Sequence, residues 1–403
     1  MINRTLSLYR NAYSGLTPST WWLSFVMLIN RSGTMVLPFM IIYLTSPAMG
    51  YSIGKAGIVM GLFGLGAVIG AYLGGKLTDS IGFYPVQIMA LVGGGILFMV
   101  LGQMKSFPLI CTFSFLLSFV NEAFRPANAT AIVAYSSAEN RTRSYATNRL
   151  AVNLGWAVGN AIGGLLASID YHLLFWVDGG SNLLAALLLW YVLRPSKNPA
   201  KQVAKKKVTA DPTHSAYRDK VYLWFIAIIV VFACCFFQLF SNLTAYYRNE
   251  LNFSERFIGL LGAVNGLMIV VIEMVLIFKL EKKKSPGYYI LRGILLCGIA
   301  YLLLNIFPTT HLMALVIVIV MTIGEILAIP FMNTFWVSRT NEHNRGEYAA
   351  LFTIAWSVAQ TFGPFVAAQI AQFAGFTVLW WCIAGACLLC VGCFYQLRRR
   401  YQV

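Results

Sequence analysis

Charged side chains are scarce in this chain, and acidic ones are the scarcest. Only 11% of the 403 residues are charged, with 14 Asp or Glu against 30 Lys or Arg, whereas 59% are hydrophobic. A soluble domain of this composition would expose far more apolar surface than water tolerates. The composition therefore excludes a soluble globular protein and predicts an integral membrane protein.

The residue clusters that an enzyme would need are also lacking. The four histidines are scattered, and the eight cysteines lie mostly in apolar stretches without metal-ligand spacing or a disulfide framework. A membrane enzyme would need a paired-carboxylate metal motif, a His-rich loop or an activated nucleophile. A receptor would need a substantial soluble domain, which the short loops exclude. We therefore expect no enzyme, no cofactor and no metal site.

Long apolar runs dominate the chain instead. A run of about 18 or more residues, at ~1.5 Å per residue, is long enough to cross ~30 Å of hydrocarbon. These runs predict an all-α membrane protein with twelve transmembrane helices. The predicted spans are 19–45, 53–77, 85–104, 108–135, 145–168, 172–193, 221–247, 256–279, 288–306, 311–337, 348–371 and 375–397.

The basic residues that produce the net charge of +16 are sorted by side of the membrane. The two tails and the loops after predicted helices 2, 4, 6, 8 and 10, counted with the helix ends beside them, hold 24 Lys and Arg, and the opposite side holds four. This distribution follows the positive-inside rule, so we expect both termini in the cytoplasm and the protein in the inner cell membrane. Nucleic acid is not an expected partner, because no recognition face gathers the charge.

The sequence pattern predicts two duplicated halves joined by a polar linker. Residues 195–220 are rich in Lys and Pro, and six predicted helices lie on either side, which predicts bundles over 1–194 and 221–403. Residues in the two halves match at an offset of about 202 to 204, as expected for halves related by an axis along the membrane normal. The matching pairs are Pro126 with Pro330, Asn140 with Asn344, Arg141 with Arg345, Gly159 with Gly363, Gly57 with Gly259, and Asp79 with Glu281.

The loop after predicted helix 2 carries a recognisable motif. It reads Gly74-Gly75-Lys76-Leu77-Thr78-Asp79-Ser80-Ile81-Gly82, with Ser80, Phe83 and Tyr84 where basic residues usually stand. With the twelve-helix duplication, the chain resembles the major facilitator superfamily over essentially its whole length. The resemblance implies a cytoplasmic gate involving Gly75, Asp79 and Gly82. The Asp79 carboxylate could rest against the positive N-terminus of a helix of the other half; the alternative is a solvated turn.

Ionisable side chains inside the predicted spans are the strongest functional signal. Arg31, Glu122, Arg125, Glu273 and Glu325 all lie in apolar stretches, where charges are costly and count as functional by default. Arg31 is too deep to reach water by snorkelling, and its guanidinium would suit a substrate carboxylate or phosphate; the alternative is a structural ion pair. Glu273 is as well explained by a structural role as by a functional one.

Two of these groups are candidates for proton coupling. Glu122 and Arg125 are three residues apart, so they can touch on one helical face and either neutralise each other or exchange a proton. Glu325 has no basic residue in its own predicted helix. A carboxyl group whose proton affinity depends on which side is open is the simplest coupling element; a permanently neutral, hydrogen-bonded carboxyl is the alternative.

Uncharged polar residues occur at the same depth in the second half. Together with Arg31 and Glu325, these residues predict a substrate-binding cavity, although lone amides in membrane helices often serve only packing. They are Gln238, Asn242, Asn265 and Asn333.

Two branches of the superfamily fit the chain. Its length, its motif and the glycines of predicted helix 5 resemble twelve-helix drug:proton antiporters. The stretches Asn265–Val271 and Gly324–Pro330 resemble proton-coupled oligopeptide transporters, where this Asn and Glu hold a peptide's amino terminus. We expect a monomeric, proton-coupled secondary transporter of small organic molecules that works by alternating access and exports amphipathic compounds. Uptake of peptide-like zwitterions is the alternative.

Overall fold

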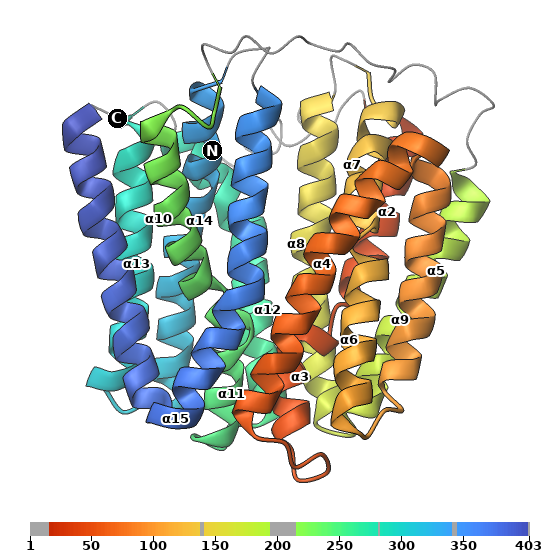
Figure 1. The fold of residues 1–403 in the computed structure, drawn as a ribbon, viewed down its shortest axis with the longest axis horizontal. Coiled ribbons are helices and arrows are strands. Elements are labelled where there is room, and N and C mark those ends of the chain that lie inside the picture. The colour runs from red at the N-terminus through yellow and green to blue at the C-terminus, as the bar shows by residue number, and fades with distance from the viewer. Residues whose placement is uncertain (1–15, 138–140, 194–214, 281–282, 341–344, 402–403) are drawn as a thin grey trace, which may run out of the picture. The chain divides into compact units, whose positions relative to one another are not determined.

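The computed structural model describes residues 16–137, 141–193, 215–280, 283–340 and 345–401, and every regular element among them is helical (Figure 1). The first part of the chain contains α2 (Pro18–Ser32), α3 (Val36–Thr45), α4 (Ile53–Ile81), α5 (Phe83–Leu101), α6 (Phe107–Asn121), α7 (Phe124–Tyr135), α8 (Arg141–Ala167) and α9 (His172–Val192). The second part contains α10 (Lys220–Phe236), the 3-10 turn η2 (Phe237–Phe240), α11 (Asn242–Asn249), α12 (Glu255–Leu280), α13 (Pro286–Ile306), α14 (His311–Ser338) and α15 (Arg345–Tyr401).

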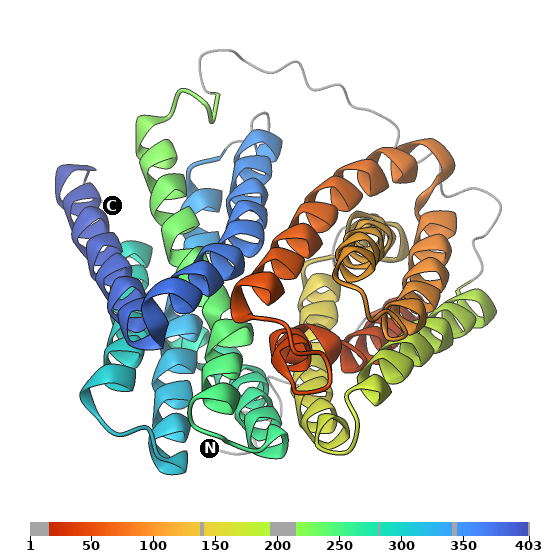
Figure 2. The same ribbon diagram turned by 60° about the horizontal axis from the view of Figure 1, so that its bottom comes forward.

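The membrane-spanning pattern agrees with the predicted fold. The described residues contain 11 helical stretches long and apolar enough to cross a membrane, and the last of them, in α15, holds both predicted spans 348–371 and 375–397. Gly375 separates these two spans with a φ of 84°, a left-handed conformation that glycine adopts without strain. Figure 2 shows the two segments of α15 meeting at an angle. The prediction of an all-α, twelve-helix membrane protein is confirmed.

Three predicted spans are not continuous helices. The first is divided into α2 and α3 after Ser32, and the fourth into α6 and α7 around Glu122. The seventh passes from α10 through η2 to α11. Each break frees backbone groups that lipid cannot satisfy, so other parts of the protein must bond them.

Contacts divide the chain into two compact units. Unit 1 comprises residues 1–36 and 65–205, and unit 2 comprises residues 37–64 and 206–403, so the single helix α4 contributes to both. The contacts thus group residues 37–64 with the second half of the chain. Most of the predicted linker 195–220 falls within residues 194–214, which lie outside the described residues. The bundle boundaries derived from the duplication stay a prediction.

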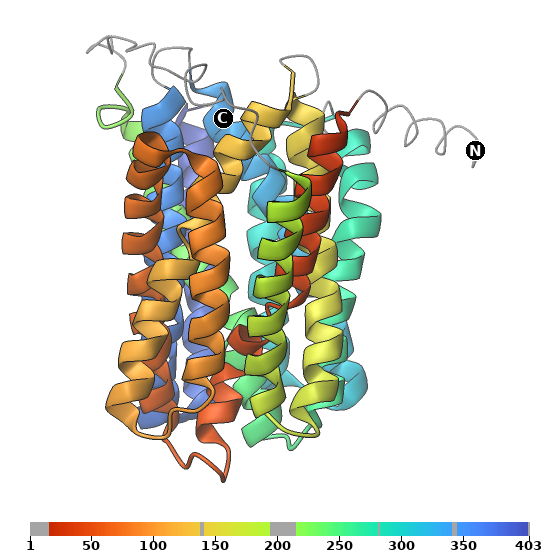
Figure 3. The same cartoon turned by 90° about the vertical axis from the view of Figure 1, so that its right-hand side faces the viewer.

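Unit 1 is built around an apolar core and a close helix contact. Leu23, Leu91, Phe124 and Leu189 bring α2, α5, α7 and α9 together in the core, and Figure 3 shows α2, in red, beside α9. On α4, glycines spaced four residues apart face the α6–α7 segment. A Cβ on Gly70 would lie only 2.1 Å from the backbone oxygen of Phe119, so the absence of a side chain permits this approach. Gly66 and Gly74 make similar contacts with Phe115 and Ala123.

Unit 2 has an aromatic core at the end where α10 begins. Phe225 of α10 packs against Phe335 of α14 with 4.2 Å between the ring centroids and an angle of 40° between the ring planes, and the ring centroid of Phe394 of α15 lies within 6.3 Å of both. Such aromatic pairs stabilise beyond the area that they bury. They fix the ends of three helices of this unit together.

One packing contact recurs at equivalent places in the two halves. In unit 1, a Cβ on Gly159 of α8 would lie 3.0 Å from the Ser32 backbone oxygen, and in unit 2 a Cβ on Gly363 of α15 would lie 3.0 Å from Cys234 of α10. The glycines are 204 residues apart and their partners 202, which are the offsets of the predicted duplication. The same helix pair is therefore packed through the same small residue in both halves.

The contact at Gly70 can be tested with an alanine substitution. We expect Gly70→Ala to destabilise the protein by about 1–3 kcal/mol, because the new methyl group must push α4 away from Phe119. Thermal unfolding of the purified protein measures the change. Gly180→Ala is the matched control, since nothing lies within 4 Å of a Cβ there. Equal stability of the two variants would contradict the packing argument.

Candidate functional site

Arg31 lies in the last turn of α2, next to the break in the first span. A Cβ on Gly155 of α8 would lie 2.6 Å from the Arg31 Cβ, so this glycine lets α8 press closely on the arginine. Its Nε is buried and has no hydrogen-bond partner among the described residues. Glu122 and Arg125 are the charged side chains near enough to act on it. Arg31 therefore retains donor capacity that an anionic group could use.

Glu122 and Arg125 form an ion pair at the break between α6 and α7. Arg125 Nη2 lies 2.9 Å from Glu122 Oε2. The side chain of Arg125 is 52% exposed and that of Glu122 is 7% exposed. The pair bridges the break, because Glu122 caps the end of α6 and Arg125 is the second residue of α7. The predicted contact is confirmed, and its role in proton coupling stays a prediction.

A buried carboxylate of α9 holds the break in the first span. Asp178 is fully buried, and its carboxylate accepts hydrogen bonds from the backbone N–H groups of Met35 at 3.0 Å and Val36 at 2.9 Å. These are donors at the start of α3, where a helix lacks internal acceptors. Asn182, four residues on, accepts a hydrogen bond from Asn30 of α2 at 3.0 Å. The helix α9 thus bonds both sides of the break.

Asp178 was not among the predicted functional residues. It stands in the apolar run 172–193, where an acidic residue followed by Gly179, Gly180 and Ser181 was a usable signal. Its partners are backbone groups from residues about 140 positions earlier, which no local pattern reveals. The side chain serves the backbone near Arg31 rather than a second charged side chain.

In unit 2, Asn265 connects α12 to α14. Its Nδ2 donates to Glu325 Oε2 and to Thr322 Oγ1, both at 3.0 Å. Thr322 and Asn265 are buried, whereas Glu325 is half-buried. The carboxyl group can accept this bond with or without its proton, because an oxygen is available in either state. Asn265 and Glu325, which were predicted on separate helices, are therefore in direct contact.

Gln238 and Asn242 lie at the break between α10 and α11. Asn242 Nδ2 donates to Gln238 Oε1 at 2.7 Å and to the Pro364 backbone oxygen of α15 at 3.1 Å. The Asn242 Oδ1 atom is buried without a hydrogen-bond partner among the described residues. Asn333 accepts a bond from Trp336 Nε1 at 3.2 Å on α14 and is half-buried. The amides of the break pair with each other and keep one acceptor for a ligand or water.

The predicted gate residues lie at the end of α4. Asp79 is exposed, and Gly82 precedes α5 as its N-cap with a φ of 91°, which a residue with a side chain would adopt only under strain. A Cβ on Gly75 would lie 3.9 Å from Pro126 of α7, an ordinary contact distance. Gly82 therefore has a defined conformational role in the turn, and gating by these three residues stays a prediction.

An ion pair that the sequence analysis missed joins α10 and α14. Asp219 caps α10 and receives two bonds from Arg339, from Nε at 2.8 Å and from Nη2 at 2.9 Å. Tyr348 Oη also donates to it at 2.9 Å. Burial alone would raise the pKa of Asp219, but the bonds from the Tyr222 N–H, Tyr348 and Arg339 outweigh it and lower the pKa. The carboxylate is stabilised in its charged form.

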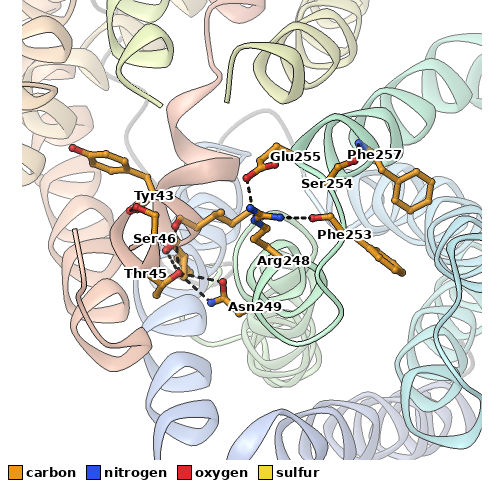
Figure 4. Close-up of polar contacts among 11 residues, drawn as sticks. Tyr43, Thr45, Ser46, Arg248, Asn249, Phe253, Ser254, Glu255 and Phe257 are labelled. Carbon is orange, nitrogen blue, oxygen red and sulfur yellow. Dashed lines mark hydrogen bonds and ion pairs between the residues drawn. The ribbon is translucent and has the colours of Figure 1, made fainter. Parts of the chain in front are cut away.

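A second group of polar contacts in unit 2 lies around the turn between α11 and α12 (Figure 4). Arg248 of α11 pairs with Glu255 of α12 at 3.0 Å and donates to the Phe253 backbone oxygen at 3.2 Å. Asn249 donates to Thr45 of α3 at 3.0 Å. These contacts stiffen the short turn between α11 and α12 and tie α3 to it.

The described residues offer no set of metal ligands. No group of three or more His, Cys, Asp or Glu among them is placed to hold a metal ion, and the eight cysteines are free thiols. The breaks, buried carboxyl groups and amides within the membrane-spanning helices of the two units are features of transport proteins.

Comparison with known proteins agrees with this class. The chain matches the Major Facilitator Superfamily over residues 21–364. It is 22% identical to the tetracycline resistance protein, class B, of Escherichia coli over 78% of each chain. It is also 22% identical to a Na(+), Li(+), K(+)/H(+) antiporter of Planococcus maritimus, covering 86% of this chain and 87% of that one. A solved structure of a POT family transporter with a thioalcohol-conjugated peptide covers 96% of this chain and 97% of its own, at a TM-score of 0.80 and 14% identity.

The fold and its polar clusters define a multi-pass membrane transporter rather than an enzyme. The chain belongs to the Major Facilitator Superfamily.

The role of Asp178 can be tested by removing its acceptor oxygens. We expect Asp178→Ala to lower the free energy of unfolding by about 1–3 kcal/mol, because the N–H groups of Met35 and Val36 would be left buried without an acceptor. Asp178→Asn keeps one acceptor oxygen and should lose less. Thermal unfolding of the purified variants measures both. The argument is refuted if Asp178→Ala is as stable as the unmodified protein.

The Asp219 interaction should make stability depend on pH. The folded state lowers the pKa of Asp219, so the pair stabilises the protein above the unfolded value of about 3.9 and is lost as the pH falls through the folded pKa. We expect Asp219→Asn to melt at a lower temperature at pH 7 and to lose less on acidification to pH 3. Scanning fluorimetry from pH 7 to 3 measures this, with the exposed Glu250→Gln as control. Parallel curves for Asp219→Asn and the unmodified protein would contradict it.

Proposed function

We propose that this transporter is proton-coupled and exports amphipathic small organic molecules by alternating access. The observation that carries the proposal is the hydrogen bond between Asn265 and Glu325 inside membrane-spanning helices. A carboxyl group at this depth changes the charge of its surroundings by a full unit when it gains or loses a proton. A bound cargo that competes for Glu325 would therefore be coupled to proton binding.

The relatives support both parts of this proposal. A tetracycline resistance protein and a cation/H(+) antiporter share the fold family and most of the length of this chain. Exchange of cargo against protons needs one group that both can occupy in turn, and Glu325 fits that role. Glu122, paired with Arg125, is a second candidate in unit 1.

The substrate-binding role is assigned to polar groups that keep unused hydrogen-bonding capacity. Arg31 has a buried Nε without a partner among the described residues, and within the same described part of the chain Asn242 has a buried Oδ1 without one. Gln238, Asn265, Glu325 and Asn333 complete the proposed set. An amphipathic compound needs few such contacts, since most of its surface is apolar.

Alternating access needs segments that can change conformation, and the broken spans supply them. The breaks after α2 and after α10 are held by a small number of side-chain bonds rather than by a continuous helix ladder. We assign Gly75, Asp79 and Gly82 to the gate on the side where both termini are proposed to lie, the cytoplasm. The sidedness of the basic residues supports this orientation in an inner membrane. We propose that a single chain carries out transport.

Uptake of peptide-like zwitterions is the second candidate. It is favoured by the Asn265–Glu325 bond, which could hold an ammonium group, and by Arg31, whose guanidinium could hold a carboxylate. The structural likeness to a peptide-bound POT family transporter is consistent with it. The two candidates differ in cargo charge and in direction, so one assay separates them.

The test uses the full chain reconstituted in vesicles with an imposed pH gradient. We expect pH-driven movement of ethidium, a lipophilic cation, and its abolition in Glu325→Gln, because the amide cannot bind or release a proton. Exchange of ethidium without a gradient should persist in that variant. Alanylalanine replaces ethidium in the assay of the second candidate.

Glu250→Gln, at an exposed carboxylate at the end of α11, is the control and should retain pH-driven transport. Unchanged pH-driven accumulation in Glu325→Gln would remove this residue from the coupling mechanism. Movement of alanylalanine but not ethidium would replace the first candidate by the second.

A further inference from the structure

Two arginines from different helices converge on one tyrosine in unit 2. The guanidinium carbon of Arg292 on α13 lies 4.0 Å from the centroid of the Tyr288 ring, and that of Arg398 on α15 lies 5.7 Å from it. The two helices pack against each other, as Figure 1 shows. Arg292 reaches the ring because helical side chains lean towards the N-terminus, and Tyr288 is one turn earlier. Two positive charges are thus gathered around one aromatic ring.

No acidic side chain in the described residues neutralises this pair. Neither Arg292 nor Arg398 forms an ion pair or hydrogen bond with any residue of the described ranges. Exposed Lys283, Lys284 and Arg399 add further positive charge at the same two helix ends. Like charges held this close repel each other, and an anion between them would remove the repulsion.

The start of α13 provides a further unused polar group. Ser285 caps this helix, three residues before Tyr288, yet its side chain makes no capping bond. The hydroxyl oxygen is buried and has no hydrogen-bond partner among the described residues. The start of α13, which also carries Tyr288 and Arg292, thus has an unused hydroxyl donor, a group suited to the oxygens of a phosphate.

An apolar stripe continues from this charged group along α15. Leu388, Gly392 and Tyr395 recur every three or four residues along α15, and all are exposed in unit 2. Nothing lies within 4 Å of a Cβ on Gly392, so the stripe has open space one to two turns from the arginines. Because α15 spans the membrane, hydrocarbon chains cover such a stripe.

We propose that Tyr288, Arg292 and Arg398 form a binding site for an anionic glycerophospholipid. Its phosphate lies between the two guanidinium groups, and an acyl chain follows the exposed stripe of α15. The ring of Tyr288 holds the guanidinium planes in place through cation–π contacts. The site is at the ends of α13 and α15 on the side predicted to be cytoplasmic, where anionic lipid attracts basic clusters.

The test compares lipids on the purified full chain in a neutral detergent. Native mass spectrometry counts bound dioleoylphosphatidylglycerol against dioleoylphosphatidylcholine, and scanning fluorimetry measures the melting temperature with each. We expect preferential binding of phosphatidylglycerol and a higher melting temperature with it. Arg292→Gln with Arg398→Gln should weaken that binding about tenfold, given the attraction of each basic residue to an anionic lipid.

The control removes the same number of charges elsewhere. Lys76→Gln with Lys220→Gln eliminates a lysine that lies 4.6 Å from the Tyr72 ring centroid and a second exposed lysine. This control should keep the preference, whereas Tyr288→Leu, which retains both arginines, should weaken it about threefold.

Three outcomes would overturn the proposal. The first is an unchanged preference for phosphatidylglycerol in the double arginine variant. The second is an equal loss in the lysine control, which would indicate unspecific attraction to the basic surface. The third is displacement of phosphatidylglycerol by inorganic phosphate at equal concentration, which would identify a site for free anions.

Discussion

Every polar group that this chain places among hydrocarbon must find its partner inside the protein, because lipid offers none. This constraint is most severe where a spanning helix is interrupted. Asp178 accepts the hydrogen bonds of two backbone N–H groups at the break between α2 and α3. At the break after α10, Gln238 Nε2 donates to the backbone oxygen of Cys234, and Asn242 Nδ2 donates to the Pro364 backbone oxygen of α15. The interruptions are therefore maintained by specific side chains from neighbouring helices.

The two halves solve this problem with different chemistry although they are packed alike. Gly159 and Gly363 occupy matching positions and admit matching neighbours, so one close helix contact is found in both halves. In the first half the buried groups include the carboxyl groups of Asp178 and of Glu122, which pairs with the exposed Arg125. In the second half, Asn265 donates to Glu325, and Gln238 accepts from Asn242 at the break after α10. Conserved packing with divergent polar residues leaves room for separate roles in cargo binding and coupling.

Composition and apolar run lengths were enough to predict the helices and the membrane class. Local spacing also predicted the contact of Glu122 with Arg125, because partners three residues apart share a helical face. The bond between Asn265 and Glu325 could be anticipated only through the family resemblance. Asp178 and Asp219 were missed, since their partners are far away in sequence and, for Asp178, are backbone groups. The helix breaks were also missed, because the apolar composition continues through them.

The single-residue connection at Gly375 has a mechanical consequence. Two membrane spans meet there without a loop, and the left-handed conformation of one glycine makes the turn. A loop would absorb displacement of either span, but a joint of one residue transmits it. The orientation of the segment before Gly375, which carries Gly363 and Pro364, relative to the segment that ends at the basic C-terminal turn is therefore set by the backbone angles of one glycine. The last two spans therefore move as one unit unless the backbone angles of Gly375 change.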